Sequence, residues 1–502
     1  MATDMPAVRV SRGHAAICGA LATAAGLGVG HLVALLAPGS SPVVAVASRA
    51  IDATPRPVKD WAVATFGTGD KAVLVTGAVV VTLALGALVG VVARRSLRAA
   101  LLCGAALVVV AVVAAGADPG RSVLWWAPGL VALLVGGFAL TWLLRAATEI
   151  GGDGSGRRAW LRLALGIGAA GAVGGLLGQS LRGTAATPPV TLPARPITPF
   201  PTGLEAQVPG LSPFVTPASD FYRIDTALVP PSLDAASWRL SIGGMVDHPY
   251  SISWDELIVM EAIDRPVTLA CVSNDVGGDL IGSARWLGVR TSVLLGRAVV
   301  QAGADMVLST SSDGFTVSTP LEALLDGRDA LVAYGMNGAA LPREHGYPAR
   351  LLTPGLYGFV GATKWLVKME VTTYAARQAY WTVRGWSDHG PIKPGSRIEV
   401  PQPGTRVQAG AVKVGGTAWA HGVGVGNVQI RVDGGAWSDV TLGPDGGIEF
   451  WRQWLWTWDA TPGEHQLQVR VVDAAGRPQD QTDRPPFPDG ASGLHTIKVT
   501  VR

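Results

Sequence analysis

The chain has 502 residues, of which 48% are hydrophobic and 15% charged, and its mean hydropathy is +0.33. This length exceeds one ordinary domain, and the hydropathy exceeds that expected of a wholly soluble chain. The net charge of +3 is small and the basic residues form only short clusters, which excludes nucleic-acid binding as the main function.

Residues 1–182 are rich in Ala, Val, Leu and Gly and carry few charges, which indicates a transmembrane region. Its apolar stretches approach the ~20 residues with which a helix crosses about 30 Å of hydrocarbon. We expect five spans, at about 14–37, 72–93, 99–117, 123–144 and 160–178. Buried helices of a soluble core are the alternative, but they seldom reach this length five times in one chain.

Basic residues indicate how these spans are oriented. They gather before the first span and in the second and fourth loops: Arg9, Arg12, Arg94, Arg95, Arg98, Arg145, Arg157, Arg158 and Arg162. Because cytoplasmic loops carry the excess of Lys and Arg, the N-terminus is expected inside and the chain after residue 182 outside the cytoplasm. The longer first loop also carries bases, diluted by acids, and weakens this bias without reversing it: Arg49, Arg56, Lys59, Lys71, Asp52, Asp60 and Asp70.

The fifth span begins with Arg157-Arg158-Ala159-Trp160-Leu161-Arg162 and continues as a mildly apolar stretch rich in Gly and Ala. This pattern resembles a twin-arginine export signal, which serves domains that fold before they cross the membrane. Paired arginines before a helix are also an ordinary positive-inside anchor, so that interpretation stays open. His14 and His31 lie in one apolar segment, which favours packing or interfacial roles over a facing pair of haem ligands.

The composition and the periodicity of the chain change after the membrane region. Residues 183–209 are rich in proline, which predicts an extended linker. Residues 210–398 combine short β-like runs with helical stretches such as Trp254–Glu261, which predicts an α+β domain. Residues 399–502 alternate strands with Gly turns and predict a β-sandwich, with strands at Val428–Val432, Phe450–Trp458, His465–Val472 and Leu494–Val501.

The chain has three cysteines, of which Cys18 and Cys103 lie in apolar runs of the membrane region. Cys271 is the only cysteine after that region. It stands in the segment Leu269-Ala270-Cys271-Val272-Ser273-Asn274, with glycines following. A free thiol among glycines and polar residues suits a soft metal ligand or a nucleophile. A buried, inert cysteine is the alternative, because free cysteine is among the most buried residue types.

Four segments, in this order, carry a resemblance to a known family. They are Phe221-Tyr222-Arg223; the Cys271 segment with Gly282-Ser283-Ala284-Arg285-Trp286-Leu287-Gly288-Val289-Arg290; Tyr334-Gly335-Met336-Asn337-Gly338 through Leu341-Pro342-Arg343-Glu344-His345-Gly346-Tyr347-Pro348-Ala349-Arg350; and Pro354-Gly355-Leu356-Tyr357-Gly358 to Lys364-Trp365-Leu366. Over residues 210–502 the chain resembles the sulfite oxidase family of molybdopterin-dependent oxidoreductases, in its membrane-anchored actinobacterial form. The resemblance implies a sulfite-oxidase-like molybdopterin domain and an Ig-like sandwich of the kind used for dimerisation.

The resemblance also implies the site residues. Cys271 would give its thiolate to molybdenum, with two further sulfurs coming from the dithiolene of one pterin, and soft thiolate ligation fits such a metal. Catalytic positions fall on Cys271, Arg223, Phe315 and Arg452. Basic groups and amides for the anionic pterin fall on Tyr222, Arg223, His345, Arg350, Ala362, Thr363 and Lys364, with Ser311 and Asp313 as further candidates.

The sequence departs from sulfite oxidases proper on the substrate side. Their Asn-Arg-Arg run is Asn274-Asp275-Val276 here, their active-site tyrosine matches Phe315, and Asp225 replaces the histidine after Arg223. Sulfite needs cations if it is to leave water, so we expect a different substrate. Arg452 is the remaining candidate substrate arginine, and stacking between sandwich tryptophans is its alternative role.

We therefore expect a multi-pass protein of the cell membrane, in contact with lipid, that transfers an oxygen atom or two electrons between molybdenum and a small extracytoplasmic substrate. No segment resembles a cytochrome b5-like haem domain, so we expect no haem and an electron-transfer protein or a quinone as electron partner. A homodimer is a candidate assembly. A catalytically silent membrane scaffold that binds cofactor or a partner is the alternative, and a cysteine-dependent hydrolase using His345 is a third interpretation.

Overall fold

The computed structural model describes residues 10–36, 40–55, 58, 61, 65–66, 70–117, 123–148, 154–183, 192 and 199–502. It divides into two compact units, Met1–Ala186 with Thr226–Ser232, and Thr187–Asp225 with Leu233–Arg502. Most of the predicted linker, residues 184–191 and 193–198, lies outside the described residues, as do Arg9, Arg56, Lys59 and Asp60.

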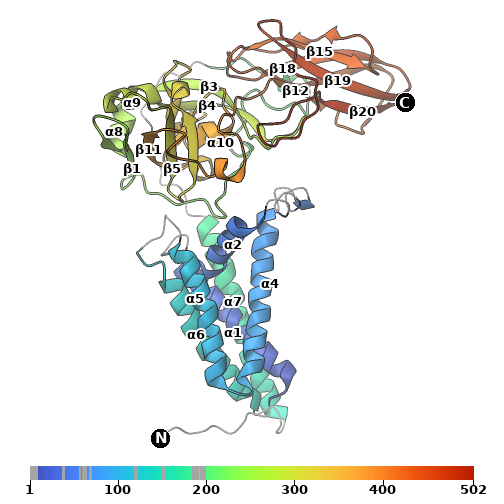
Figure 1. The fold of residues 1–502 in the computed structure, drawn as a ribbon. Helices are drawn as coiled ribbons and strands as arrows, with labels where there is room; N and C mark the ends of the chain where they lie inside the picture. Colours follow the sequence, from blue (N-terminus) through green and yellow to red (C-terminus); the bar gives the residue numbers. More distant parts are fainter. Residues whose placement is uncertain are drawn as a thin grey trace. The chain divides into compact units, whose positions relative to one another are not determined.

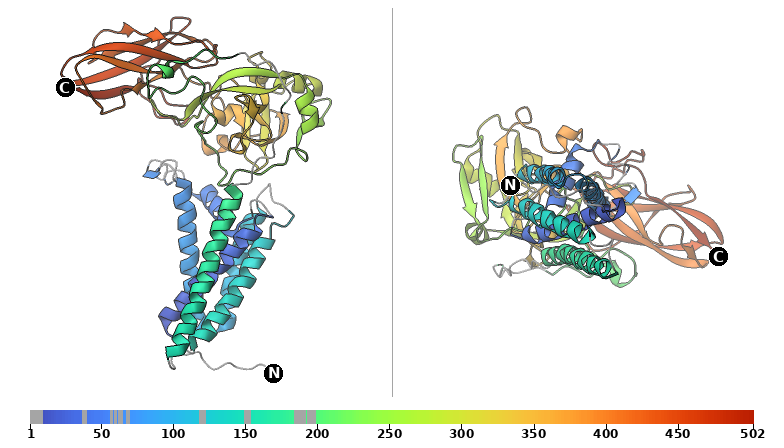
Figure 2. Two further views of the ribbon diagram at one scale, coloured as in Figure 1. Left: turned by 180° about the vertical axis from the view of Figure 1, so that it is seen from behind. Right: turned by 90° about the horizontal axis from the view of Figure 1, so that it is seen from below.

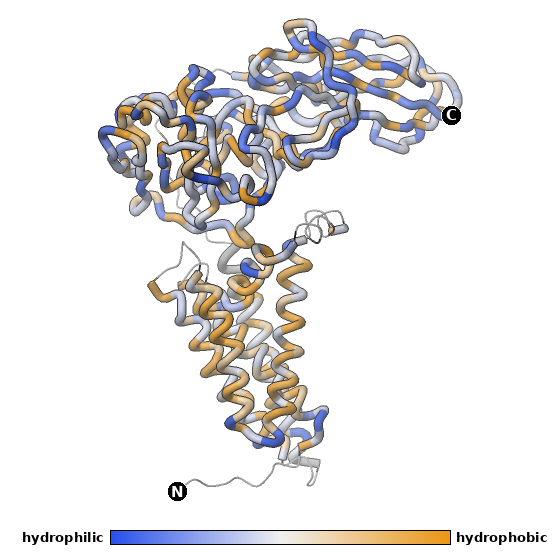
Figure 3. Tube along the Cα trace, in the orientation of Figure 1, coloured by the Kyte–Doolittle hydropathy of each residue, from blue (hydrophilic) through white to orange (hydrophobic). Residues whose placement is uncertain are grey.

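The first unit contains a bundle of long apolar helices (Figure 1). These are α1 (Arg12–Val33), α4 (Asp70–Ala93), α5 (Leu97–Gly116), α6 (Ala127–Thr148) and α7 (Gly154–Gly183). Each is long and apolar enough to cross a membrane, so the five predicted helices are confirmed. Hydrophilic residues gather at the ends of the bundle, and apolar residues fill its length (Figure 3).

Helix α1 packs against α4, α6 and α7, and small residues allow this close approach. A side chain at Gly19 would collide with the backbone of Gly86 and Gly90 on α4, and one at Gly28 would collide with Gly171 on α7. Small residues at helix crossings let backbones meet in this way. The views in Figure 2 show these helices running beside one another.

The ends of the helices agree with the predicted clustering of basic residues. Arg94, in the turn between α4 and α5, donates from Nε to the carbonyl of Val10 at 2.7 Å. The start of α1 and this turn therefore lie at the same end of the bundle. His14 packs edge-on against Trp160 at 5.1 Å, and His31 shares a 2.9 Å hydrogen bond with Ser41, so the two histidines do not face one another.

Among the described helices of this unit, α2 (Pro42–Ala53) was not predicted. It contacts α4 and α5, within what the sequence indicates to be the first loop. Its twelve residues are too few to span a bilayer, and they include Arg49 and Asp52, so no long apolar run marks it.

The second unit begins with two sheets around one core. The first has the strand order β2-β1-β11-β5-β6 and the second β10-β9-β7-β4-β3, with β8 beside β7; only β1 and β11 pair in parallel. The strands are β1 (Arg239–Gly244), β2 (Tyr250–Ser253), β3 (Ile263–Ala270), β4 (Ile281–Arg290), β5 (Met306–Ser311), β6 (Thr316–Pro320), β7 (Leu331–Met336), β8 (Ala339–Ala340), β9 (Arg350–Leu352), β10 (Ala362–Thr363) and β11 (Leu366–Thr372). Buried residues of both sheets, among them Ile242, Trp286 and Val371, form the core.

Short helices flank these sheets: α8 (Trp254–Val259), α9 (Thr291–Ala298) and α10 (Gly358–Gly361). The predicted helix at Trp254–Glu261 is α8. A capping box starts it, because the Ser253 hydroxyl accepts from the Glu256 amide while the Glu256 carboxylate accepts from the Ser253 amide. This region contains more strand than helix, so the expected α+β domain is a β-rich one.

The C-terminal part forms a sandwich of two sheets, β12-β14-β18-β17 and β13-β20-β19-β15-β16, in which all neighbouring strands are antiparallel except the parallel pair β13 and β20. Its strands are β12 (Gly395–Val400), β13 (Arg406–Val407), β14 (Gly410–Trp419), β15 (Val425–Val432), β16 (Ser438–Asp439), β17 (Thr441–Leu442), β18 (Arg452–Ala460), β19 (Gly463–Asp473) and β20 (Thr496–Val501). Alternate residues such as Val428, Ile430, Leu467 and Val469 fill the shared core. The four predicted strands are present, and β12 begins just before the predicted start at residue 399.

Candidate active site

Cys271 directly follows β3 and opens the loop that returns as β4. Its amide donates to the carbonyl of Leu280 at 2.9 Å, and the Leu280 amide donates to Oδ1 of Asn274 at 2.8 Å. Arg397, from β12 of the sandwich, donates to the carbonyl of Gly278 at 2.7 Å. The loop is thus held at both ends and at its tip, which fixes the position of the half-buried thiol.

Burial raises the pKa of the Cys271 thiol, while a backbone hydrogen bond from Ser273 and the charge of Lys364 oppose that rise. The free thiol therefore stays protonated near neutral pH, which disfavours the hydrolase interpretation because that chemistry needs a thiolate. The proposed base is also engaged: Nε2 of His345 lies 2.7 Å from the Ala218 carbonyl, and burial lowers the pKa of the imidazole to about 4.

Basic side chains converge beside this thiol. Lys364 and Arg223 share the buried carboxylate of Asp225, at 3.3 Å and 3.0 Å respectively. Burial lowers the pKa of Lys364 to about 8, Asp225 opposes this shift, and the neighbouring Arg350 adds to it. One acid thus faces several cations, and the cluster retains a positive charge that suits an anionic ligand.

Arg350 is the most buried of these cations, with 4% of its surface exposed. Its Nη1 donates to the His345 carbonyl at 3.1 Å, and its guanidinium lies over the Trp286 ring at 5.0 Å. Its Nε has no hydrogen-bond partner among the described residues. A buried donor without a partner costs free energy, so this atom fits a site completed by an anionic group.

Tyr222 joins this group through a run of aromatic rings. It stacks on Phe221 at 5.2 Å, and Phe221 meets His345 edge-on at 5.5 Å. Burial raises the pKa of the Tyr222 hydroxyl, Cys271 raises it further, and Arg350 lowers it. Tyr222, Arg350 and Cys271 are therefore neighbours, as the resemblance implied.

The turn between β5 and β6 carries Ser311, Asp313 and Phe315. Its side chains hold the turn itself, because Oδ1 of Asp313 accepts from the Phe315 amide at 3.1 Å. The Ser312 amide donates to the Trp365 carbonyl at 2.9 Å, so the turn lies next to Thr363 and Lys364. Ser309 and Thr363 share a 2.7 Å hydrogen bond between buried hydroxyls. Ala362 and Thr363 form the short strand β10.

Arg452 lies apart from this group. Its guanidinium donates to the carbonyls of Gly443 and Val425 at 3.1 and 3.4 Å and lies 3.5 Å from Asp445. These partners belong to the sandwich and its loops. Among the described residues, the hydrogen bonds and the ion pair of Arg452 lie within the sandwich, and its contacts include neither Cys271 nor a stacked tryptophan.

Tyr357 lies near Cys271, although sequence reasoning did not name it as a site residue. Its hydroxyl accepts from the Lys393 amide at 3.4 Å, and the adjacent Gly358 lies near the carbonyl of Ala270, directly before Cys271. Burial raises the pKa of Tyr357 to about 12, the Lys393 amide opposes this shift, and Cys271 adds to it. The segment Pro354–Gly358 had been singled out, but only the folded chain brings this hydroxyl to the thiol.

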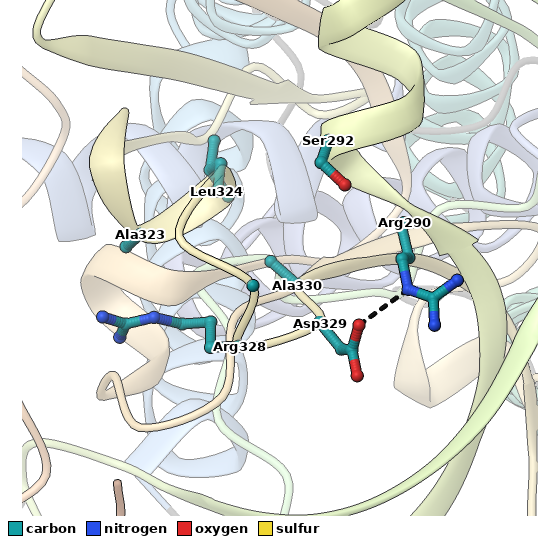
Figure 4. A pocket seen from close by; sticks show the side chains of 8 residues that line it. Arg290, Ser292, Ala323, Leu324, Arg328, Asp329 and Ala330 are labelled. Carbon is teal, nitrogen blue, oxygen red and sulfur yellow. Dashed lines mark hydrogen bonds and ion pairs between the residues drawn. The ribbon is translucent and has the colours of Figure 1, made fainter.

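A separate concavity lies between the start of α9 and the loop before β7 (Figure 4). Arg290 and Asp329 line it and form a 2.7 Å ion pair. It shares no residue with the group around Cys271.

Comparisons with known proteins agree with this geometry. The family model "Oxidoreductase molybdopterin binding domain" matches residues 227–381. Rat (Rattus norvegicus) mitochondrial sulfite oxidase is 29% identical over 290 residues, which are 49% of this chain and 52% of the relative. The oxidoreductase YuiH of Bacillus subtilis (strain 168) is 30% identical over 172 residues, which are 34% of this chain and 83% of that protein.

The chain belongs to the sulfite oxidase family. It carries an oxidoreductase molybdopterin-binding domain, and its relatives support molybdenum–molybdopterin as the cofactor. The sulfane dehydrogenase SoxCD of Paracoccus pantotrophus shares the fold, with a TM-score of 0.51 at 23% identity over 57% of this chain and 81% of that one. The chain spans about half the length of the sulfite oxidases that it matches.

Proposed function

We propose that this family member is a membrane-anchored molybdenum–molybdopterin enzyme that transfers an oxygen atom or two electrons to or from a small extracytoplasmic substrate other than sulfite. One observation carries the proposal: the Cys271 thiol adjoins a buried basic cluster in which the Nε of Arg350 has no partner among the described residues. The thiol suits a soft metal, and the cluster suits the anionic cofactor attached to it.

The chain's own residues would divide the work as follows. Cys271 would hold the metal, and Arg223, Arg350 and Lys364 would bind the anionic pterin. Tyr222 and the neutral His345 would order the segment that carries Arg223. When bound, the molybdenum cofactor supplies oxygen-atom and electron transfer, and the protein positions it. Tyr357, whose high pKa keeps its hydroxyl protonated, would hold a proton beside the thiol.

The substrate side supports a ligand other than sulfite. Asp275 is exposed in the Cys271 loop, where an arginine would be expected of a sulfite oxidase. Phe315 supplies a ring, 5.4 Å from that of Tyr380, in place of a hydroxyl. Arg452 bonds to the sandwich, so this arginine is not available to a small oxyanion at Cys271.

We infer the cellular arrangement from the helices. Five apolar helices would anchor the chain, with residues 183–209 as linker and the catalytic half outside the cytoplasm. Export by the twin-arginine route through Arg157 and Arg158 is part of this proposal. So are an Ig-like assignment and dimerisation for the sandwich, lipid contact by the helices, and an electron-transfer protein or quinone as redox partner.

The test uses the full chain, purified in detergent from a host that makes the cofactor, beside Cys271→Ser. Molybdenum and pterin are quantified, and turnover is followed with redox dyes. We expect about one molybdenum per chain in the wild type and at least a tenfold loss of dye-linked turnover in the variant. A folded wild-type protein without molybdenum or pterin would contradict the proposal. Normal metal content without turnover of any substrate would favour the silent scaffold instead.

A further inference from the structure

We propose that the loop between β19 and β20, residues 483–493 of the sandwich, forms a wall of the substrate approach to Cys271. In this proposal Phe487 determines specificity by selecting uncharged substrates with an apolar or aromatic substituent. The inference rests on the proposed function, because it assumes that substrate reaches Cys271.

The loop is attached to one side of the site. The carbonyl of Pro488 accepts from the Ser387 amide at 3.1 Å, and the carbonyl of Gly490 accepts from Nζ of Lys393 at 2.6 Å. The Lys393 amide also donates to Tyr357, and a side chain at Gly490 would meet the Tyr357 ring. This end of the loop therefore lies against the hydroxyl that adjoins Cys271.

The other end of the loop is attached to the Cys271 loop itself. A side chain at Gly493 would approach Val276, and one at Gly277 would collide with the ring of His495. His495 is in turn held by a 2.9 Å hydrogen bond from the Ile398 amide to its Nδ1. Arg484 and Ser492 exchange backbone hydrogen bonds of 3.0 and 3.2 Å, which close the loop between these two attachments.

A series of aromatic rings connects this loop with the segment around Cys271. Phe487 meets Trp386 edge-on at 5.3 Å, and Trp386 lies 5.9 Å from Phe359. Phe359 and Trp386 pack in the same apolar cluster as Ala270 and Val272, the two neighbours of Cys271. Phe487 is half-buried at the outer end of this series, where it would contact a molecule on its way to the thiol.

One lysine at this wall is neutralised by an acid of the loop. Lys393 and Asp489 form a 3.0 Å ion pair, so this lysine offers no uncommitted charge to an oxyanion. A wall with aromatic rings and a neutralised lysine favours a neutral substrate with an apolar substituent. Contacts between such rings and the substituent can distinguish substrates by the size of the apolar group.

The test measures access to Cys271 without using the enzyme's activity. Cys18 and Cys103 are replaced by Ser in the full chain, the cofactor-free protein is prepared, and Cys271 alkylation rates are measured with N-phenylmaleimide and N-methylmaleimide. Both probes are uncharged, so the basic cluster treats them alike. We expect Phe487→Ala to lower the ratio of phenyl to methyl rates at least threefold and Phe487→Tyr to retain it. Ile448→Ala, at an exposed position in another sandwich loop, is the matched control.

An unchanged ratio in Phe487→Ala, in protein whose thermal unfolding matches that of the parent, would overturn the inference. An equal fall in the Ile448→Ala control would overturn it too, because the effect would then not be specific to this loop. Molybdenum content is measured separately in the wild type. If Phe487→Ala loses the preference for the phenyl probe but the wild type contains no molybdenum, the wall is supported and the proposed function is contradicted.

Discussion

The two sides of Cys271 are built differently. On the proposed cofactor side, Lys364 and Arg223 share the Asp225 carboxylate, and the buried Nε of Arg350 has no partner among the described residues. On the proposed substrate side, Phe487 contacts Trp386, and Lys393 and Asp489 neutralise each other. The difference teaches that the proposed cofactor site has an excess of cations that suits an anion, whereas the proposed substrate approach combines aromatic rings with a neutralised Lys393–Asp489 pair.

The largest expected effect comes from removing the buried cation of the cofactor side. Arg350→Met should lower molybdenum and pterin content at least tenfold, because the orphaned Nε and the guanidinium charge both disappear. Metal analysis of the purified chain measures this. Arg377→Met, at a half-exposed arginine paired with Glu370, serves as control and should retain the cofactor. Full molybdenum content in Arg350→Met would break the comparison.

The next effect is a pH dependence on the same side. The pKa of Lys364 is about 8 in the folded, cofactor-free protein, well below its ordinary value, so the lysine loses its charge as pH rises through 8. Affinity for the cofactor should then fall, by about tenfold between pH 7 and 9.5, since a charge-assisted hydrogen bond is lost. Titration of cofactor uptake measures the change. Lys364→Arg should remove the dependence, and an unaltered pH profile in that variant would count against the assignment.

The same lysine makes an opposite prediction for stability. Between pH 8 and the ordinary lysine pKa, the unfolded chain holds a proton that the folded chain has released. Folding therefore becomes more favourable as pH rises through that window in the cofactor-free protein. Thermal unfolding of wild type and Lys364→Met over this range tests the sign, and the variant should show the smaller slope. Equal slopes would show that Lys364 is not the group responsible.

On the proposed substrate side, the arginine and the tyrosine expected of a sulfite oxidase can be introduced at positions 275 and 315 to test how the two sides of Cys271 differ. Asp275→Arg combined with Phe315→Tyr places a cation and a hydroxyl where the chain has an acid and a ring. We expect sulfite to bind several-fold more tightly to the double variant, because the added cation and hydroxyl can bind an oxyanion. Inhibition or turnover by sulfite measures this, and the exposed position 275 should tolerate the substitution. Phe315→Tyr alone should do little. Strong sulfite turnover by the unmodified chain would remove the contrast between the two sides.

The smallest expected effect concerns the loop that follows Cys271. Asn274→Ala removes the acceptor for the Leu280 amide and should cost about 1 kcal/mol of folding free energy, since one loop hydrogen bond is lost. Thermal unfolding measures it, with Asp279→Ala, an exposed position in the same loop, as control. A shift no larger than that of the control would show that Asn274 does not order the loop.

What the sequence could predict followed from local pattern. Runs of about 20 apolar residues identified five helices, and alternation identified the sandwich strands. Helix α2 was not predicted, because it is short and carries charges. The pairing of Asp225 with Lys364 joins residues 139 positions apart, which no local pattern reports.

The site was predictable to the extent that motifs carried it. Cys271, Tyr222, His345, Arg350 and Lys364 were named from the resemblance, and the fold brings them together. Arg452 was named on the same basis, yet its hydrogen bonds to Gly443 and Val425 keep it in the sandwich. Tyr357 and Phe487 depend on contacts between distant loops, so only the three-dimensional structure could point to them.

The most direct test of the account counts the sulfur atoms bound to molybdenum by X-ray absorption at the molybdenum edge, in the wild type and in Cys271→Ser. The account predicts three sulfur ligands in the wild type, two from the pterin dithiolene and one from Cys271, and two in the variant. The same sulfur count in both proteins would contradict it, because molybdenum would then be held without the thiol on which the proposed site is built.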